Sequence, residues 1–390
     1  MIISFVRTPF RVAVAAAALL AVSPQTTPSA RADAAEHRSA LPDKLSDAEF
    51  WKIVTDLSEP DDYFRIVDNF TSNEGEIAQV FTMLRDTKVQ GDVYLGVGPE
   101  QNLTYIAAVR PQMAFICDIR RQAVVQHLMY KAMFEMSKDR ADFISLLFGI
   151  PRPDGLDSTT EIGRIWGAFD GAARDTVLQN RNYTRVVDRI TKTHGFTLTQ
   201  DETIKLNKVF YAFQEYGPRI TTQSGSGGRA GFGGGFGGLT FESLTGDRTD
   251  NAGKVQSFLS TEDNFRFVKS LEDRNLLIPI SGDFGKTKAL RGIGAWIKDH
   301  GGIVRAFYVS NVESYLFQDG KNGTFYENVA TFPVDSASVF IRPYSMRGGR
   351  GGGGYFGTPR PLCPIAAFER LFKADSVRSY AEALACAVGK

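Results

Sequence analysis

The sequence predicts an α/β protein built on a doubly wound, mostly parallel β-sheet. Short apolar runs at 93–97 and 113–117 alternate with segments whose apolar residues recur at helical spacing. The alternation resumes at 276–280 and 303–309 after a long interval. Apolar strands separated by helices are typical of a parallel sheet that helices cover on both faces.

Start signals and periodicity predict the helices between these strands. Asn73 and Glu76 have the spacing of a capping box ahead of an apolar stripe. The segment 101–109 is expected to be helical and to end before Pro111. Apolar residues return at helical spacing over 119–136. The order of elements is therefore helix, strand, helix, strand, helix.

Five parts are expected along the chain. Stretches 223–238 and 347–357 are rich in glycine and are predicted to be mobile loops, because glycine loses the most backbone entropy on ordering. Between the two halves of the sheet, Thr199 and Glu202 again have capping-box spacing. The parts are a signal peptide (1–34), a first part of the core with N-terminal helices (35–136), a mostly helical insertion with a Gly-rich loop (137–270), a second part of the core (271–346), and a Gly-rich loop with a helical tail (347–390).

The first residues have the pattern of a cleavable secretory signal peptide. Arg7 and Arg11 precede an apolar run at 12–22, and small residues suited to cleavage follow near Ala32 and Ala34. That run is shorter than the roughly 20 residues that span a bilayer, although an uncleaved anchor is the alternative. We expect a periplasmic or secreted protein without a stable membrane span.

Composition narrows the choice of partners. Lys and Arg number 45 against 44 Asp and Glu, so no global charge attracts nucleic acid, and a small-molecule ligand is expected. The four His and three Cys do not fall at metal-ligand spacing, so no metal site is predicted. Cys117 is expected to be a buried thiol, whereas Cys363 and Cys386 either pair in an oxidising compartment or stay free.

Polar residues follow the predicted strands. The first strand leads into 96–102, where glycines allow close approach to a ligand and where Asn102 is a further candidate contact. Asp118 follows the second strand, and Asp283 follows a later one. Asn311 and Glu313 come after the strand at 303–309. Ligands of open α/β sheets bind where such strand ends converge, so one crevice is expected to hold these groups.

At these residues the sequence resembles the Rossmann-like S-adenosylmethionine-dependent methyltransferases, in particular an uncharacterised bacterial group. The resemblance rests on three stretches: 93–98 as the glycine-rich first motif, 115–118 with the second-strand acid, and 280–284 at the fourth-strand position. It covers under a third of the chain.

The resemblance implies S-adenosylmethionine as a possible cofactor. Gly96, Gly98 and Asp118 would contact it, and Asp283 would lie next to the methyl acceptor. Glu100 stands at the place of the family's third glycine, where its carboxylate would either repel the cofactor's carboxylate or bind its ammonium group.

The sequence leaves three functions open. The first is an exported protein with a methyltransferase-like core that binds S-adenosylmethionine or a related small polar ligand. The second is a non-catalytic exported binding or scaffold module that has lost the cofactor. The third is a hydrolase with Asp283 and Glu313 as general acid and base, while Asn311 completes the candidate catalytic set. Asp118 and Asp283 also fit a purely structural role as helix caps. The sequence specifies neither the methyl acceptor nor the oligomeric state.

Overall fold

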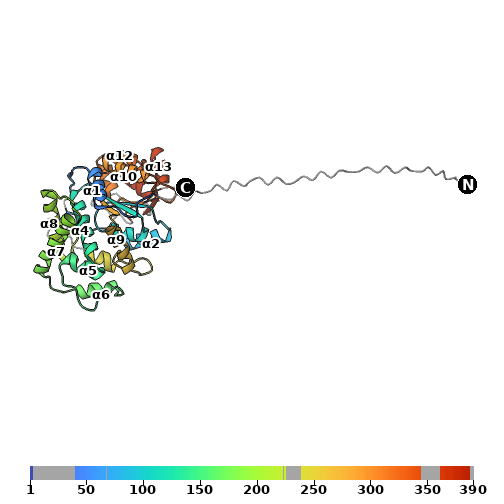
Figure 1. Ribbon diagram of the computed structural model, residues 1–390. Helices are drawn as coiled ribbons and strands as arrows, with labels where there is room; N and C mark the ends of the chain where they lie inside the picture. Colours follow the sequence, from blue (N-terminus) through green and yellow to red (C-terminus); the bar gives the residue numbers. More distant parts are fainter. Residues whose placement is uncertain (3–39, 67, 223, 225–238, 344–360, 387–390) are drawn as a thin grey trace, which may run out of the picture. The chain divides into compact units, whose positions relative to one another are not determined.

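The computed structural model divides into two units, Met1–His37 and Arg38–Lys390, and the helices and strands found among the described residues belong to the second (Figure 1). The predicted signal peptide beyond Ile2 and the Gly-rich stretches, Ser224 excepted, lie outside the described residues. The structure describes residues 1–2, 40–66, 68–222, 224, 239–343 and 361–386.

A six-stranded sheet forms the centre of the second unit, in the order β3-β2-β1-β4-β5-β6. Neighbouring strands are parallel except β6, which is antiparallel to β5. The predicted α/β class with a mostly parallel sheet is therefore confirmed. The strands are β1 (Val93–Gly96), β2 (Met113–Asp118), β3 (Leu277–Ser281), β4 (Val304–Tyr308), β5 (Val339–Ile341) and β6 (Leu362–Pro364).

The chain reverses direction across the sheet at β1. It runs outward from β1 through β2 to β3 and then returns to the other side of β1 as β4 and β5. The carboxyl ends of β1 and β4 are thus adjacent at the point where the strand order reverses. Loops at such a point diverge and leave room for a ligand.

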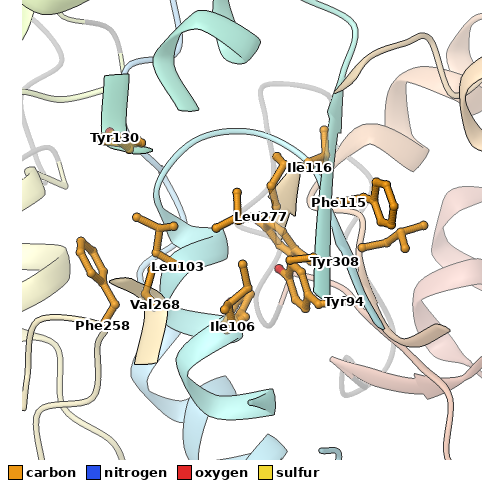
Figure 2. Close-up of a cluster of buried hydrophobic side chains, with 14 of the residues drawn as sticks. Tyr94, Leu103, Ile106, Phe115, Ile116, Tyr130, Phe258, Val268, Leu277 and Tyr308 are labelled. Atoms are coloured by element: carbon orange, nitrogen blue, oxygen red, sulfur yellow. The ribbon is translucent and has the colours of Figure 1, made fainter. Parts of the chain in front are cut away.

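Helices pack on both faces of the sheet. Phe115 of β2 contacts Trp296 of α10, with 5.5 Å between ring centroids. Leu103 and Ile106 of α3 lie on the opposite side of β2 from Phe115 (Figure 2). The helices are α1 (Asp47–Leu57), α2 (Ile77–Asp86), α3 (Gln101–Val109), α4 (Arg121–Met136), α5 (Arg140–Phe148), α6 (Ile162–Phe169), α7 (Thr176–Asp188), α8 (Gln200–Tyr216), α9 (Glu262–Asp273), α10 (Lys288–Asp299), α11 (Val312–Gln318), α12 (Asn322–Val329), α13 (Ile365–Lys373) and α14 (Tyr380–Ala385).

Local signals predicted several of these helices correctly. The helix at 101–109 is α3, and its C-cap Arg110 adopts a left-handed conformation just before Pro111. The capping box of Thr199 and Glu202 is present at the start of α8. The described residues between β2 and β3 are mostly helical, with short isolated bridges at Thr221–Thr240 and Thr249–Val255.

Two expectations were wrong. Glu76 is the N-cap of α2, but no side chain caps that end, so Asn73 and Glu76 do not form a capping box. The strand that precedes Asp283 is β3, which pairs with β2, and not the fourth strand. Among the described residues the helical segment between β2 and β3 adds no strand to the sheet, so Leu277–Ser281 is the third strand and Val304–Tyr308 is the fourth.

A disulfide attaches the C-terminal segment, so of the two alternatives for Cys363 and Cys386 the structure has the paired one. Cys363 of β6 is bonded to Cys386, which follows α14, with 5.9 Å between their Cα atoms. Cys117 is a buried free thiol, as expected. Within the described ranges, none of the helices has the length and apolar character needed to cross a bilayer.

Candidate functional site

A cleft lies at the carboxyl ends of β1 to β4. It encloses about 1050 Å³, the solvent at its mouth included. Four predicted site residues line it, each from the end of a different strand: Gly98, Asp118, Asp283 and Asn311. The structure therefore brings these four residues to one place.

Asp118 is bound by a neighbouring guanidinium group. Its Oδ1 accepts from the backbone N–H of Arg120 at 2.9 Å and from Nε at 3.0 Å, and its Oδ2 accepts from Nη2 at 2.9 Å. Burial would raise the pKa of Asp118, but the Arg120 charge and hydrogen bonds hold it below the ordinary value. The carboxylate is thus ionised, and Oδ2 keeps one acceptor position for a ligand donor. It closes a turn and does not cap α4.

Asp283, which follows β3, is paired with a lysine that lies between α11 and α12, after β4. Its Oδ2 accepts from Nζ of Lys321 at 2.9 Å, and its Oδ1 accepts from the backbone N–H of Gly285 at 2.8 Å. The hydrogen bond to Asp283 raises the pKa of Lys321. Both residues line the cleft, so an ion pair forms part of its wall.

Asn102 holds the loop that follows β1 and does not line the cleft. Its Nδ2 donates to the carbonyls of Val97 at 3.0 Å, Gly98 at 3.1 Å and Pro99 at 2.7 Å. A Cβ at Gly96 would lie 1.9 Å from Oδ1 of Asn102, so this close approach requires glycine. Gly96 and Asn102 are therefore explained by the loop itself, whereas Gly98, with φ +83°, lines the cleft.

Glu100 also points away from ligand space. It is 2% exposed, and its Oε1 accepts from Thr71 Oγ1 and from the backbone N–H of Ser72. Burial raises its pKa to about 7, against the lowering effect of these donors. Because it does not line the cleft, Glu100 does not reach a ligand there.

Glu313 is likewise outside the cleft. Its carboxylate is fully buried and paired with Arg342. The structure therefore does not bring Asp283 and Glu313 together as an acid and a base. Sequence spacing alone does not reveal this, since α11 turns the Glu313 side chain away from the strand end.

Three asparagines line the cleft with free hydrogen-bonding capacity. The side chains of Asn69, Asn73 and Asn311 have no hydrogen-bond partner among the described residues. A carboxamide carries two donors and one acceptor oxygen. These groups suit a polar ligand.

Aromatic side chains cover one side of the cleft. Phe64 packs edge-on against Tyr315 at 5.1 Å, and Arg120 lies over the Phe64 ring at 5.8 Å. Tyr63 lines the mouth and is 81% exposed. A flat apolar group would find contact area here.

Glu74 was not among the site residues predicted from the sequence. This residue of the segment before α2 accepts hydrogen bonds from Tyr308 and Ser310, at the end of β4. It is 236 positions from Ser310, so no local pattern links them. Within the described part of the chain, no group of three or more His, Cys, Asp or Glu side chains is arranged to hold a metal ion.

Comparison with known proteins finds a similarity to one family model and no activity. No curated protein matches the chain. A family described as a domain of unknown function, DUF7790, matches residues 69–151 and 241–351. These two segments contain β1 to β5 and most of the strand-end loops of the cleft, and they leave out most of the helical segment between β2 and β3. The chain is therefore similar to this family in the part that builds the sheet and the candidate site.

Proposed function

We propose that the cleft is the binding site of a small polar ligand, on a doubly wound, methyltransferase-like core. The observation that carries the proposal is that Gly98, Asp118, Asp283 and Asn311, from four strand ends, line one cleft. The reversal of strand order at β1 supports it, because ligands of open α/β sheets bind there.

S-adenosylmethionine is the first ligand to test. Asp118 Oδ2 retains an acceptor position for a ribose hydroxyl, and Phe64 and Tyr63 offer aromatic surface for a purine. The open asparagine amides suit the polar end of the molecule. When bound, the cofactor would supply an electrophilic methyl group; the side chains named here would bind and orient it.

One observation favours the second function, a binding module without this cofactor. Asp118 is 2% exposed, and Arg120 occupies both of its oxygens. A ribose diol that takes both oxygens would have to displace the guanidinium group. A ligand with an anionic group would instead meet Arg120 directly.

We also propose that the protein is exported. The Cys363–Cys386 disulfide supports an oxidising compartment, since such bonds persist outside the cytosol. Cell fractionation tests this: recovery of the protein from the cytosol, at full length, would contradict it.

Titration calorimetry with S-adenosylmethionine tests the cofactor. We expect binding that weakens at least about tenfold in Asp118→Ala, the loss typical of a hydrogen bond to a charged group. Asp263→Ala is the matched control, because Asp263 is 83% exposed, pairs with Arg110 and lies outside the cleft. No binding at millimolar cofactor refutes the cofactor assignment. Binding that Asp118→Ala leaves unchanged refutes the role of this carboxylate.

A further inference from the structure

A serine hydroxyl meets a carboxyl group at the end of β4. Ser310 lines the cleft, and its Oγ donates to Oε1 of Glu74 at 2.6 Å. Glu74 itself does not line the cleft. The Ser310 hydroxyl therefore lies between the cleft and the Glu74 carboxyl group, which can accept its proton.

The backbone of Ser310 is unfavourable for a residue with a side chain. Its φ is +46°, in the left-handed region, and it lies in the short turn between β4 and α11. Such conformations cost energy and cluster at functional sites. A sharp strand-to-helix turn with a strained serine is the geometry that presents nucleophilic serines on α/β sheets. The usual glycines are absent here, since the turn reads Tyr-Val-Ser-Asn-Val.

Other side chains hold Glu74 in place. The Tyr308 hydroxyl donates to Oε1 at 2.8 Å, and Nε2 of Gln101 donates to Oε2 at 3.2 Å. Gln101 is itself held by a 2.7 Å hydrogen bond to the Tyr105 hydroxyl. Burial raises the pKa of Glu74, which makes its carboxylate a stronger base than an exposed one.

We propose that Ser310 is a nucleophile activated by Glu74 and that it cleaves a carboxylic ester that enters the cleft. The Ser310 Oγ forms a bond to the ester carbonyl carbon while its proton passes to Glu74. The bond to the leaving alcohol breaks, and the alcohol takes that proton. Water then attacks the acyl-serine, Glu74 accepts a proton from the water and returns it to Ser310, and the acid is released.

The cleft also offers donors for the negative charge that develops on the ester oxygen. Asn311 follows Ser310 directly, lines the cleft, and its side chain has no hydrogen-bond partner among the described residues. An amide donor at this point would stabilise the oxyanion. Tyr308 is a positioning residue, because it acts through Glu74.

The proposal is independent of S-adenosylmethionine. It needs only the cleft, and it uses neither Asp283 nor Glu313. Calorimetry therefore tests the cofactor and serine labelling tests the nucleophile, and the failure of one experiment does not decide the other.

Labelling with a fluorophosphonate tests the nucleophile. The serine oxygen would bond to phosphorus, fluoride would leave, and Glu74 would take the proton. We expect mass spectrometry of the labelled full chain to find the adduct on Ser310 and to find none in Ser310→Ala. Ser314→Ala is the matched control, because Ser314 lies four residues further on and its Oγ, among the described residues, donates only to the Asn311 carbonyl. An unlabelled wild-type protein, or a label on Ser314 in place of Ser310, overturns the proposal.

Glu74→Gln tests the base. We expect labelling about 100-fold slower or more, which is the range of general-base effects. Tyr308→Phe keeps the carboxyl and should cause a smaller loss. Thermal unfolding checks that each variant is folded. A Glu74→Gln variant that is folded and labels at the wild-type rate overturns the role of Glu74.

The pH profile of the wild-type protein gives a readout that does not depend on any variant. The titratable groups that interact electrostatically with Glu74 are tyrosines from β1, α3, β4 and α14, and burial raises the pKa of each above the ordinary value: Tyr94, Tyr105, Tyr308 and Tyr380. The labelling rate should therefore rise with one midpoint, above the ordinary 4.5, as Glu74 loses its proton. A rate that does not change between about pH 4.5 and pH 8 contradicts the proposal.

Discussion

Glu313 and Arg342 form an ion pair that solvent does not reach. Nε donates to Oε2 at 2.7 Å and Nη2 to Oε1 at 2.8 Å, and both side chains are 0% exposed. The Tyr326 hydroxyl donates to Oε1 at 2.7 Å, and the guanidinium lies over the rings of Phe340 and Phe368. The pair therefore joins α11, α12, α13 and the end of β5.

Replacing Glu313 by Gln should strongly destabilise the fold. Arg342 would remain buried without a counter-charge, which costs about 3–5 kcal/mol. Urea denaturation measures the free energy of unfolding. Asp375→Asn is the control, because Asp375 pairs with Arg378 on the surface, where such pairs contribute less than about 1 kcal/mol. Equal losses in the two variants would contradict a structural role for the Glu313–Arg342 pair.

Removal of the Cys363–Cys386 disulfide should loosen the C-terminal segment. The bond closes a loop with a sequence separation of 23, and loops of this size stabilise by about 3 kcal/mol. Cys363→Ala with Cys386→Ala should lower the free energy of unfolding by that amount. Dithiothreitol should have the same effect on the wild-type protein and none on the double variant. A wild-type protein that is insensitive to reductant under unfolding conditions would contradict this expectation.

Stability should fall with rising pH because of His194. Its Nδ1 lies 2.8 Å from Asp47 Oδ1 and its Nε2 lies 2.8 Å from Glu135 Oε2, so both nitrogens donate and the ring is protonated. Burial lowers the pKa of His194, but the effect of the two carboxylates is larger, so the pKa lies above its ordinary value of 6.5. The protonated His194 therefore stabilises the fold fully below pH 6.5, and this stabilisation is lost as the pH rises through the folded-state pKa. Lys131 also faces this site, and its charge lowers the pKa of His194.

His194→Gln should flatten this dependence. Urea midpoints at about pH 6 and pH 8.5 measure it, since these values bracket the ordinary histidine range. His300→Gln is the control, because Nδ1 of His300 hydrogen-bonds to the backbone carbonyl of Trp296 and, among the described residues, His300 pairs with no carboxylate. If the pH dependence of stability persists in His194→Gln and disappears in His300→Gln, the prediction is wrong and His300 causes the dependence.

Glu272→Gln should stabilise the protein at alkaline pH. Burial raises the pKa of Glu272 to about 8, although Lys131 and Lys269 lower it, and its Oε1 has no partner among the described residues. Between pH 4.5 and 8 the folded state holds a proton that the unfolded chain has released, so wild-type stability falls with pH. Each pKa unit corresponds to roughly 1.4 kcal/mol.

Chemical denaturation at two pH values checks this prediction. The variant should be more stable than the wild type at about pH 8 and close to it at about pH 4.5, where Glu272 is neutral in the folded state and about half protonated in the unfolded state. Glu262→Gln, at the other end of α9, removes the ion pairs with Arg140 and Arg266 and should destabilise instead. A Glu272→Gln variant that loses stability at pH 8 would show that the carboxylate is ionised and favourable.

Patterns within a few residues predicted much of the fold. Apolar runs predicted β1 and β2, and the capping box at Thr199 predicted the start of α8, because these features depend on neighbours in sequence. Asn73 and Glu76 had the same spacing without the contacts, because spacing permits a cap but does not form one.

The candidate site depended more on tertiary structure. Asp118 and Asp283 were predicted to share a crevice because strand ends converge in parallel sheets, and both line the cleft. Arg120 is close in sequence to Asp118, so its pairing could have been anticipated. Glu74 and Lys321 could not, since each reaches its partner across dozens of residues or more.

The sequence by itself determined the α/β class, the segments of β1 to β4 and the ends of these strands at which polar groups gather, because hydrophobic periodicity and turn residues act locally. Only the tertiary structure decided that Leu277–Ser281 is the third strand, that Glu313 is enclosed with Arg342, and that Ser310 meets Glu74. Strand order and side-chain direction depend on packing between distant segments, and no local pattern encodes that packing.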